Sequence, residues 1–222
     1  MTKPLSLHPL AEDILQRLSR FPDASEIVLG GYFALQHYAG YRTTRDIDAW
    51  WKSRATRSAE EALRTVMQEE AQASGYELKE RSFADTLSLE LHRGGVKEFS
   101  FQIAVRSVVL EEPVTSAWPP ILIETLSDNV GSKMNALVNR GAPRDFLDIR
   151  RVVEVELLAA ESCWRLWAKK NTGGSIDSAK QKVRFHLVAL EGRRPLETIA
   201  DPAERRNAQE TREWFKREFL NT

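Results

Sequence analysis

An alternating segment, Arg45-Asp46-Ile47-Asp48-Ala49-Trp50-Trp51, constrains the fold of this chain more than any other feature. Residues two apart in a β-strand project from the same face, so the segment predicts a strand with Asp46 and Asp48 side by side. Two adjacent carboxylates repel each other, and a divalent cation that bridges them and a triphosphate relieves that repulsion. The segment therefore predicts a metal-binding strand, with Mg²⁺ or Mn²⁺ held by Asp46 and Asp48.

A short apolar segment that ends in two glycines precedes this strand. Residues 26–29 read as a buried strand, and Gly30-Gly31 predicts a tight turn before a helix over residues 32–38. Glycine lets backbone approach a phosphate closely, and the first amides of the following helix favour an anion. A Gly-Gly turn by itself is usually only a turn, and an Asp-x-Asp pair is usually surface charge beside arginines such as Arg42 and Arg45. Their order along the chain favours a nucleotide site.

The remaining pattern predicts a mixed first part and a helical second part. A helix is expected over residues 9–20, another starts at a capping box of Ser58 and Glu61 and closes at Gly75, and a hairpin joins strands at 87–92 and 98–105. From about Ile121 the spacing is helical. Expected helices there lie at 133–140, 145–158 and 178–190, with a final helix capped by Asp201. We expect domains at residues 1–118 and 119–222.

Composition limits the class of protein. The chain has 222 residues, 42% hydrophobic and 29% charged, which is ordinary for a globular protein. One cysteine and four scattered histidines exclude an internal disulfide and a Cys-rich zinc site, and Cys163 is expected to be a small buried hydrophobe. No apolar run approaches the roughly 20 residues that cross a bilayer, and the N-terminus lacks the apolar block of a signal peptide. These features predict a cytoplasmic protein that does not enter a membrane.

The C-terminal part is mildly basic. Acidic and basic residues balance at 32 each over the chain, but residues 161–222 hold 13 Lys and Arg against 9 Asp and Glu. This excess suits contact with RNA or another polyanion, and it keeps open a nucleic-acid-binding regulator. A solvated helix face explains it as well, and we favour that interpretation.

Two motifs together resemble a known family. Residues 29–35 (LGGYFAL) and 41–48 (YRTTRDID) resemble the first motif of the AbiEii/AbiGii-type nucleotidyltransferase toxins. Residues 133–140 (KMNALVNR), followed by 144–149 (RDFLDI), are similar to that family's downstream Lys-x-x-Ala-Leu-x-x-Arg and Arg-Asp-x-x-Asp signature. The two motifs span residues 27–150.

The resemblance implies an α+β fold. Its first part is the small mixed sheet with flanking helices of the DNA polymerase β-like nucleotidyltransferases, and a helical C-terminal portion follows. Members of the family are toxins of toxin–antitoxin pairs that use a nucleoside triphosphate, and some add nucleotides to the 3′ end of tRNA. The expected partners are therefore a nucleoside triphosphate, an RNA or protein hydroxyl as acceptor, and a cognate antitoxin.

The resemblance also implies roles for residues. Asp46 and Asp48 hold the metal, and Lys133 with Asp145 completes the catalytic set. The expected nucleotide-binding residues are Gly30, Gly31, Arg42, Thr44, Arg140 and Arg144. A lysine offers a point charge to the β and γ phosphates, and an arginine offers a planar fork.

A structural alternative exists for the downstream motif. Lys133 and Arg140 could be exposed helix residues, while Arg144, Asp145 and Asp148 cap and brace a helix start. The upstream motif favours the catalytic interpretation for Lys133 and Asp145, with Asp145 orienting either Lys133 or the acceptor hydroxyl. The role of Asp148 is left open.

One position departs from the family pattern. Many nucleotidyltransferases of this fold carry a third carboxylate on a later strand, where residues 99–103 place Gln102. An amide is a weaker magnesium ligand than a carboxylate because it carries no net charge. Glu90 or Glu98 would replace it in a different strand register. Gln102 therefore keeps open a catalytically impaired module that binds a nucleotide or a partner.

Trp50 and Trp51 follow the aspartates directly. Adjacent strand residues point to opposite faces, so at most one of the two reaches the pocket. We expect both to serve core packing.

Overall fold

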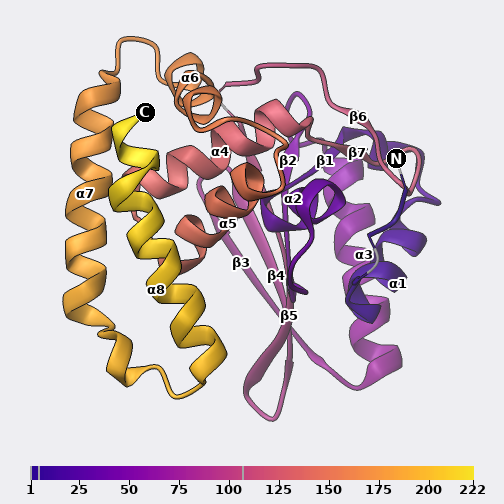
Figure 1. Cartoon of the computed structure of the whole chain (residues 1–222). Helices are drawn as coiled ribbons and strands as arrows, with labels where there is room; N and C mark the ends of the chain where they lie inside the picture. Colours follow the sequence, from indigo (N-terminus) through magenta and orange to yellow (C-terminus); the bar gives the residue numbers. More distant parts are fainter. Residues whose placement is uncertain (1, 5, 107) are drawn as a thin grey trace. The chain divides into compact units, whose positions relative to one another are not determined.

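The computed structural model describes residues 2–4, 6–106 and 108–222. The chain divides into two compact units, Met1–Asn129 and Val130–Thr222. The first unit contains a mixed β-sheet with helices and the second is helical (Figure 1). This arrangement confirms the predicted α+β class. None of the helices in the described part of the chain combines the length and apolar character that crossing a membrane requires.

Within the described residues of the first unit, seven strands form one sheet in the order β3-β4-β5-β2-β1-β7-β6. The neighbouring strands β1 and β2 are antiparallel, whereas β2 pairs with β5 and β1 pairs with β7 in parallel. The sheet is therefore mixed, as the resemblance implied. The strand bounds are β1 (Ile27–Gly30), β2 (Asp46–Trp51), β3 (Glu77–Phe83), β4 (Thr86–Arg93), β5 (Val96–Val105), β6 (Val114–Thr115) and β7 (Leu122–Ile123).

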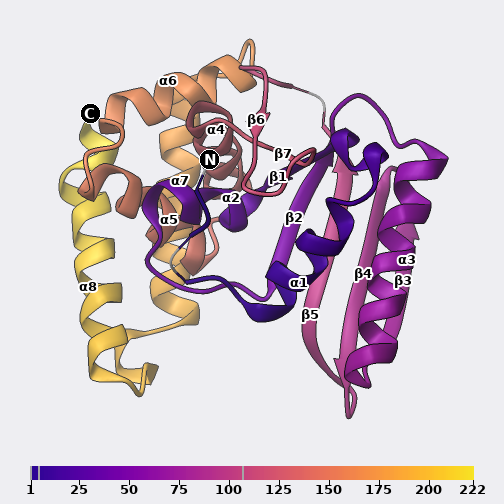
Figure 2. The ribbon, with the colours of Figure 1, turned by 90° about the vertical axis from the view of Figure 1, so that its right-hand side faces the viewer.

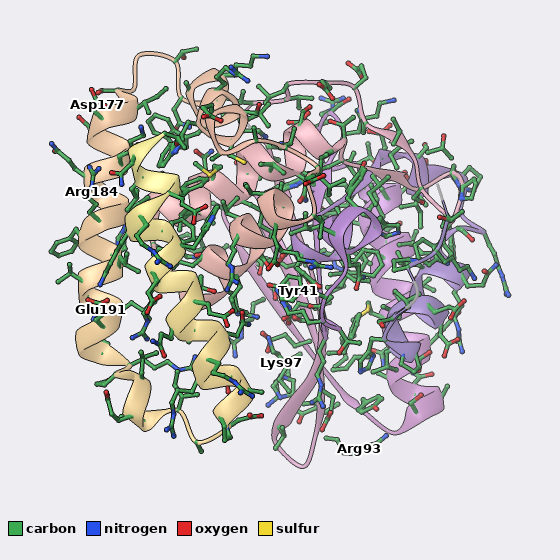
Figure 3. The ribbon with its side chains drawn as sticks, viewed as in Figure 1. Tyr41, Arg93, Lys97, Asp177, Arg184 and Glu191 are labelled. Carbon is green, nitrogen blue, oxygen red and sulfur yellow. The ribbon has the colours of Figure 1, made fainter. Side chains whose placement is uncertain are left out.

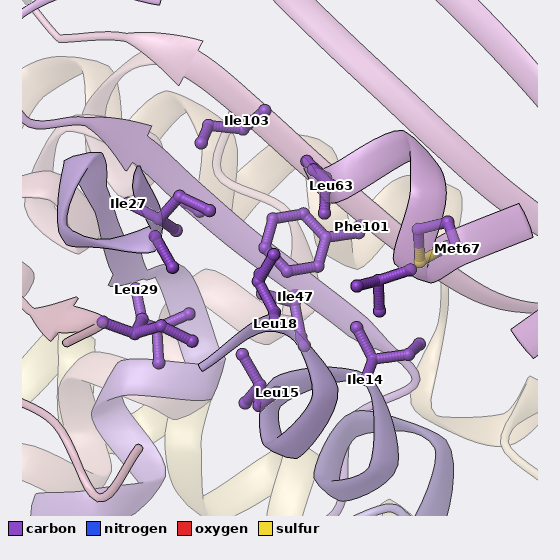
Figure 4. Packing of buried hydrophobic residues seen from close by; sticks show 14 of the residues in the cluster. Ile14, Leu15, Leu18, Ile27, Leu29, Ile47, Leu63, Met67, Phe101 and Ile103 are labelled. Carbon is purple, nitrogen blue, oxygen red and sulfur yellow. The ribbon is translucent and has the colours of Figure 1, made fainter. Parts of the chain in front are cut away.

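Three helices accompany this sheet: α1 (Pro9–Leu18), α2 (Gly31–Ala39) and α3 (Arg57–Ser74). Helices α1 and α3 pack together on one face of the sheet (Figure 2). Their apolar sides meet the inward side chains of β2 and β5 in a single core (Figure 4). Fully buried members of this core are Ile14, Leu15, Leu18, Ile47, Leu63, Met67, Phe101 and Ile103. Because Ile47 points into the core, its neighbours on β2 face the opposite side.

Helix α3 begins earlier than the sequence pattern suggested. Its N-cap is Thr56, whose side chain accepts a hydrogen bond from the amide of Ala59 at 3.3 Å. Ser58 lies inside the first turn, so the predicted capping box of Ser58 and Glu61 is wrong. Two hydroxyl residues stand two positions apart, and Thr56 is the one with extended backbone. Gly75 ends the helix in the left-handed region at φ 69°, as predicted.

The second unit is built from helices. Helix α4 (Leu126–Asn139) contains the boundary between the units, and it is followed by α5 (Pro143–Glu154), α6 (Ala160–Lys170), α7 (Ile176–Arg193) and α8 (Pro202–Arg217). Short 3₁₀ turns lie at Pro22–Glu26 in the first unit and at Leu196–Thr198 and Phe219–Asn221 in the second.

Aromatic packing and caps hold the second unit together. Phe215 packs edge-to-face against Phe146 and at a tilt against Phe219, with ring centroids 4.8 and 4.9 Å apart. Helices α7 and α8 run antiparallel (Figure 1), and an ion pair of 2.6 Å joins Glu191 to Lys216. The predicted cap of α8 is confirmed, because the Asp201 carboxylate accepts hydrogen bonds from the first amides of the helix.

Candidate active site

The two aspartates of β2 share one face of the sheet. Burial alternates along this strand, with Ile47, Ala49 and Trp51 buried and the residues between them partly exposed. This confirms the predicted strand and places Asp46 and Asp48 on the same side. Trp51 belongs to the core, whereas Trp50 lies on the aspartate side. The side chain of Asp46 is 35% exposed, so a ligand can reach it.

The Gly30-Gly31 turn lies directly against these carboxylates. Gly30 pairs with Asp48 across the antiparallel strands, and Gly31 opens α2 with φ +59°. A Cβ on Gly31 would lie 2.8 Å from the Asp48 carboxylate carbon. A Cβ on Gly30 would lie 3.0 Å from the indole Cδ1 of Trp50. The turn therefore needs glycine at both positions because the aspartate strand passes so closely.

Hydrogen bonds orient the carboxylate of Asp46. The Ser100 hydroxyl donates to its Oδ1 at 2.6 Å, and the amine of Lys97, a residue labelled in Figure 3, lies 3.3 Å from the same oxygen. The Thr44 hydroxyl accepts from the backbone amide of Asp46 at 3.2 Å. In this structure Thr44 therefore positions the start of β2. A role for Thr44 at a phosphate stays a prediction.

Tyr32 joins the loop before β2 to the glycine turn. Its hydroxyl accepts from the amides of Arg42 and Tyr41 at 2.9 and 3.1 Å, and it donates to the Arg42 carbonyl at 3.0 Å. The Arg42 guanidinium stacks over the Tyr32 ring, 3.4 Å from its centroid. This cation–π contact holds the guanidinium over the residue that follows Gly31. The contact places Arg42 close to the turn for which a phosphate was predicted.

Strand β5 supplies the neighbours of the two aspartates. In the parallel register, Asp46 pairs with Ser100 and Asp48 pairs with Gln102. The expected place of Gln102 beside the aspartates is therefore confirmed. Glu90 lies one strand further away, opposite Ser100, and Glu98 is ion-paired with Arg45 at 3.4 Å. Neither acid takes the position of Gln102.

Glu90 has an interaction of its own. Its carboxylate lies 2.9 Å from Nε2 of His92, and this hydrogen bond is the main reason that the pKa of Glu90 is lowered. Among the described residues, no group of three or more His, Cys, Asp and Glu is arranged to hold a metal ion. Magnesium commonly takes one or two protein carboxylates and completes its shell with water and substrate phosphates. The two aspartates fit that pattern, with the Gln102 carbonyl as a neutral neighbour.

A buried polar network behind the glycine turn was not predicted. The Asn129 side chain, fully buried, donates from Nδ2 to the Gly31 carbonyl and to Glu124 Oε2, both at 2.8 Å. Arg106 forms an ion pair of 2.7 Å with Glu124 and a second ion pair with Asp128. The network fixes the carbonyl of Gly31 from the side away from solvent. Its sequence signal is a set of polar residues after the apolar run 121–123, but Gly31 lies 98 positions from Asn129.

The downstream motif lies in the second unit and forms two pairs. The Lys133 amine contacts Asp148 Oδ2 at 2.7 Å, and both side chains are buried. Asp145 is 1% exposed, grips the Arg140 guanidinium through two bonds of 2.9 and 2.8 Å, and accepts from the amide of Ala142. The carboxylate at Lys133 is therefore Asp148, and the idea that Asp145 orients Lys133 is wrong.

The structural alternative for this motif holds in part. Asp145 caps the start of α5, and Arg140 is exposed, as that alternative proposed. Lys133 is buried, which contradicts it. Arg144 is exposed on the first turn of α5. The roles of Lys133, Asp145, Arg140 and Arg144 in catalysis or nucleotide binding stay predictions.

A comparison with protein families matches almost the whole chain. The model described as "Nucleotidyl transferase AbiEii toxin, Type IV TA system" covers residues 13–219. That range includes the glycine turn, the paired aspartates and the Lys133–Asp148 pair. No curated protein matches the chain. The chain therefore belongs to the AbiEii nucleotidyl transferase toxins of type IV toxin–antitoxin systems, and it is a transferase enzyme.

Proposed function

We propose that this enzyme transfers a nucleotidyl group from a nucleoside triphosphate to a hydroxyl of an RNA, such as the 3′ end of a tRNA, or of a protein. The observation that carries the proposal is the placement of Asp46 and Asp48 on one open face of β2, directly against the Gly30-Gly31 turn. A carboxylate pair beside a close backbone turn suits a metal-bound triphosphate, because the acids hold the cation and the turn admits the phosphates.

Asp46 and Asp48 would hold Mg²⁺ or Mn²⁺. When bound, the cation supplies charge neutralisation of the phosphates and of the pyrophosphate leaving group. The donor set fits this role, since two carboxylates leave room for phosphate oxygens in the coordination shell. Gln102 contributes a carbonyl dipole next to Asp48 without adding charge.

The residues around the aspartates would bind and orient the substrate. A phosphate would approach the backbone closely at Gly30 and Gly31, because neither residue has a side chain. The first amides of α2 would attract its negative charge. Arg42, held on the Tyr32 ring, offers donors to a phosphate. The Ser100 hydroxyl, 2.6 Å from Oδ1 of Asp46, would orient this carboxylate. We keep Lys133, Asp145, Arg140 and Arg144 in the proposal on the family resemblance.

The family description names a toxin of a type IV system, so we also propose a cognate antitoxin as a partner. Transfer to a translation component would explain growth inhibition. The chemistry of the site requires only an acceptor hydroxyl, and both RNA and protein provide one.

Transfer of label from α-phosphate-tagged nucleoside triphosphates to total RNA and total protein tests the proposal. Wild-type protein with Mg²⁺ should label an acceptor, whereas Asp46→Asn and Asp48→Asn should lower the labelling rate by roughly 100-fold or more, because a catalytic metal supplies several kcal/mol of transition-state stabilisation. Asp13→Asn, an exposed aspartate on α1, is the matched control and should label normally. Labelling by the Asp46 and Asp48 variants equal to that of the wild type would show that these two residues do not hold the catalytic metal.

A second candidate rests on Gln102. Because an amide stands beside Asp48 where related enzymes carry an acid, the protein could bind a nucleotide or a partner without turnover. Calorimetry that detects triphosphate binding, together with no label on any acceptor, would favour this candidate. The variant Gln102→Glu should then gain transfer activity. Metal-dependent labelling by the wild type would exclude it.

A further inference from the structure

The second unit contains a small cavity whose wall includes no residue of the proposed nucleotide site. Arg144 and Asp145 lie next to the cavity-lining Pro143 in the sequence. The cavity has a volume of about 50 Å³ and lies between α5, the end of α7 and α8. Roughly 10–15 Å³ on this measure holds one water, so the cavity takes about three to five water-sized groups. Its wall is mostly apolar and includes Phe146, Leu147, Leu190, Ile199 and Ala208. Cavities of this kind bind small molecules through a few polar groups.

The polar group of interest in the wall is Arg212. It is 6% exposed, and its Nη2 donates to the Arg194 carbonyl at 2.6 Å. Its Nε is buried and has no hydrogen-bond acceptor in the described part of the chain. Burial is the main cause that lowers the pKa of this guanidinium. A buried charge that lacks a counter-ion is costly, so an incoming anion would be strongly favoured there.

The nearby carboxylates have other partners. Glu204 in the wall is ion-paired with Arg194 at 2.7 Å, and Glu191, labelled on α7 in Figure 3, is ion-paired with Lys216 at 2.6 Å. Arg212 itself forms no ion pair with a carboxylate among the residues that the structure describes. Without direct contact, the Glu191 and Glu197 carboxylates favour the charge of Arg212, and the nearby Arg194 guanidinium opposes it. The protein therefore supplies two arginines here and a carboxylate for one of them.

We propose that this cavity binds a short-chain carboxylate of about two to four carbons, with its carboxylate on Arg212 and its hydrocarbon part against Phe146 and Leu190. A planar carboxylate matches the guanidinium fork, and the apolar wall favours a hydrocarbon over a second charge. The small volume favours a short chain. No residue of the proposed nucleotide site takes part in this contact.

Ligand-observed NMR and calorimetry with butyrate test the proposal. Three other probes test each property of butyrate. Butanol removes the charge, butylamine reverses it, and inorganic phosphate keeps a negative charge without the hydrocarbon. Butyrate should bind at least tenfold more tightly than each of the three. Arg212→Met should weaken butyrate binding at least tenfold, and Arg206→Met, an exposed arginine on the same helix, should leave it unchanged.

A second variant protects the test against a folding defect. Ala208→Leu fills the cavity and keeps Arg212, so it should block butyrate while the melting temperature stays close to that of the wild type. Arg212→Met without ligand should melt at a higher temperature, because an apolar side chain replaces a buried charge. Binding of butanol as tight as that of butyrate, or unchanged butyrate binding by Arg212→Met, would overturn the proposal. Preference for inorganic phosphate would overturn it as well.

Discussion

Gly31 and Asp48 approach so closely that no side chain fits at position 31. A Cβ there would lie 2.7 Å from the Cβ of Asp48, well inside the distance at which two carbons repel. The positive φ of Gly31 adds a second reason for glycine. The close approach of Asp48 therefore requires glycine at position 31, whether or not a phosphate binds there.

Gly31→Ala should displace Asp48 and abolish nucleotide binding. The backbone strain at positive φ costs about 1–3 kcal/mol, and the overlap with Asp48 adds to it. Urea unfolding and calorimetry with a nucleoside triphosphate and Mg²⁺ measure the two effects. Gly75→Ala is the matched control, since Gly75 has φ +69° and nothing within 4 Å of a new Cβ. It should lose stability and keep binding. Normal binding by Gly31→Ala would contradict the steric argument.

Asn129→Ala should raise the KM for the nucleotide more than it lowers kcat. The change removes the donor that fixes the Gly31 carbonyl and leaves the buried Glu124 carboxylate without that partner. Loss of a hydrogen bond to a buried group costs about 1–3 kcal/mol of stability. Asn129→Asp should be worse, because it places a second anion against Glu124. Steady-state kinetics and urea unfolding check both variants.

Asn221→Ala is the control for this prediction. Its Nδ2 donates to two backbone carbonyls at 3.1 and 2.9 Å near the C-terminus. It should leave the KM for the nucleotide unchanged. A rise in KM equal to that of Asn129→Ala would show that the effect is not specific to the glycine turn.

Asp148→Asn should destabilise the protein strongly. The change removes the charge of a buried carboxylate that contacts the Lys133 amine at 2.7 Å, and removing one partner of a buried ion pair costs about 3–5 kcal/mol. Lys133→Met combined with Asp148→Asn should cost less than the sum of the single changes. Glu213→Gln breaks an exposed pair with Arg217 and should cost less than about 1 kcal/mol. Additive effects in urea unfolding would contradict a coupled pair.

The buried thiol of Cys163 should lower the free energy of unfolding at alkaline pH. Burial is the main cause that raises the pKa of this thiol from 9.0 to about 12. Between about pH 9 and 12 the unfolded chain releases the proton while the folded chain keeps it, so stability falls as pH rises. The slope reaches at most about 1.4 kcal/mol per pH unit. Cys163→Ala should lack this part of the decline in urea unfolding across the range.

The difference in stability between the wild type and Cys163→Ala isolates the thiol, because every other titrating group is the same in both proteins. The pKa of Tyr38 is also raised to about 12, chiefly by burial, but this phenol is present in both proteins. A disulfide exchange reagent at pH 8 should label Cys163 only after unfolding. Rapid labelling of the folded protein would contradict the buried, protonated thiol.

The sequence pattern predicts secondary structure correctly where the determining residues are neighbours in the chain. The alternation of Asp46 to Trp51 identified β2 and its two faces, and Asp201 with Pro202 located the start of α8. Strand β3 was missed because it is an edge strand with mostly exposed, charged residues, so it lacks the apolar alternation of a buried strand. The capping box expected at Ser58 and Glu61 was wrong because Thr56, two residues earlier, is also a residue type that caps helices, and it is the one with extended backbone.

The sequence by itself determined the strand with two acids on one side, the glycine turn before it and the helical second half, because hydrophobic spacing and turn chemistry act between residues close in the chain. The tertiary structure decided that Asn129 supports Gly31, that Lys133 pairs with Asp148, and that the buried Arg212 Nε lies in a cavity wall with no acceptor among the described residues. Each of these outcomes depends on which buried polar groups packing brings together. The partner of a buried charge or amide is decided by the fold, because a buried polar group bonds to the complementary group that the fold places beside it.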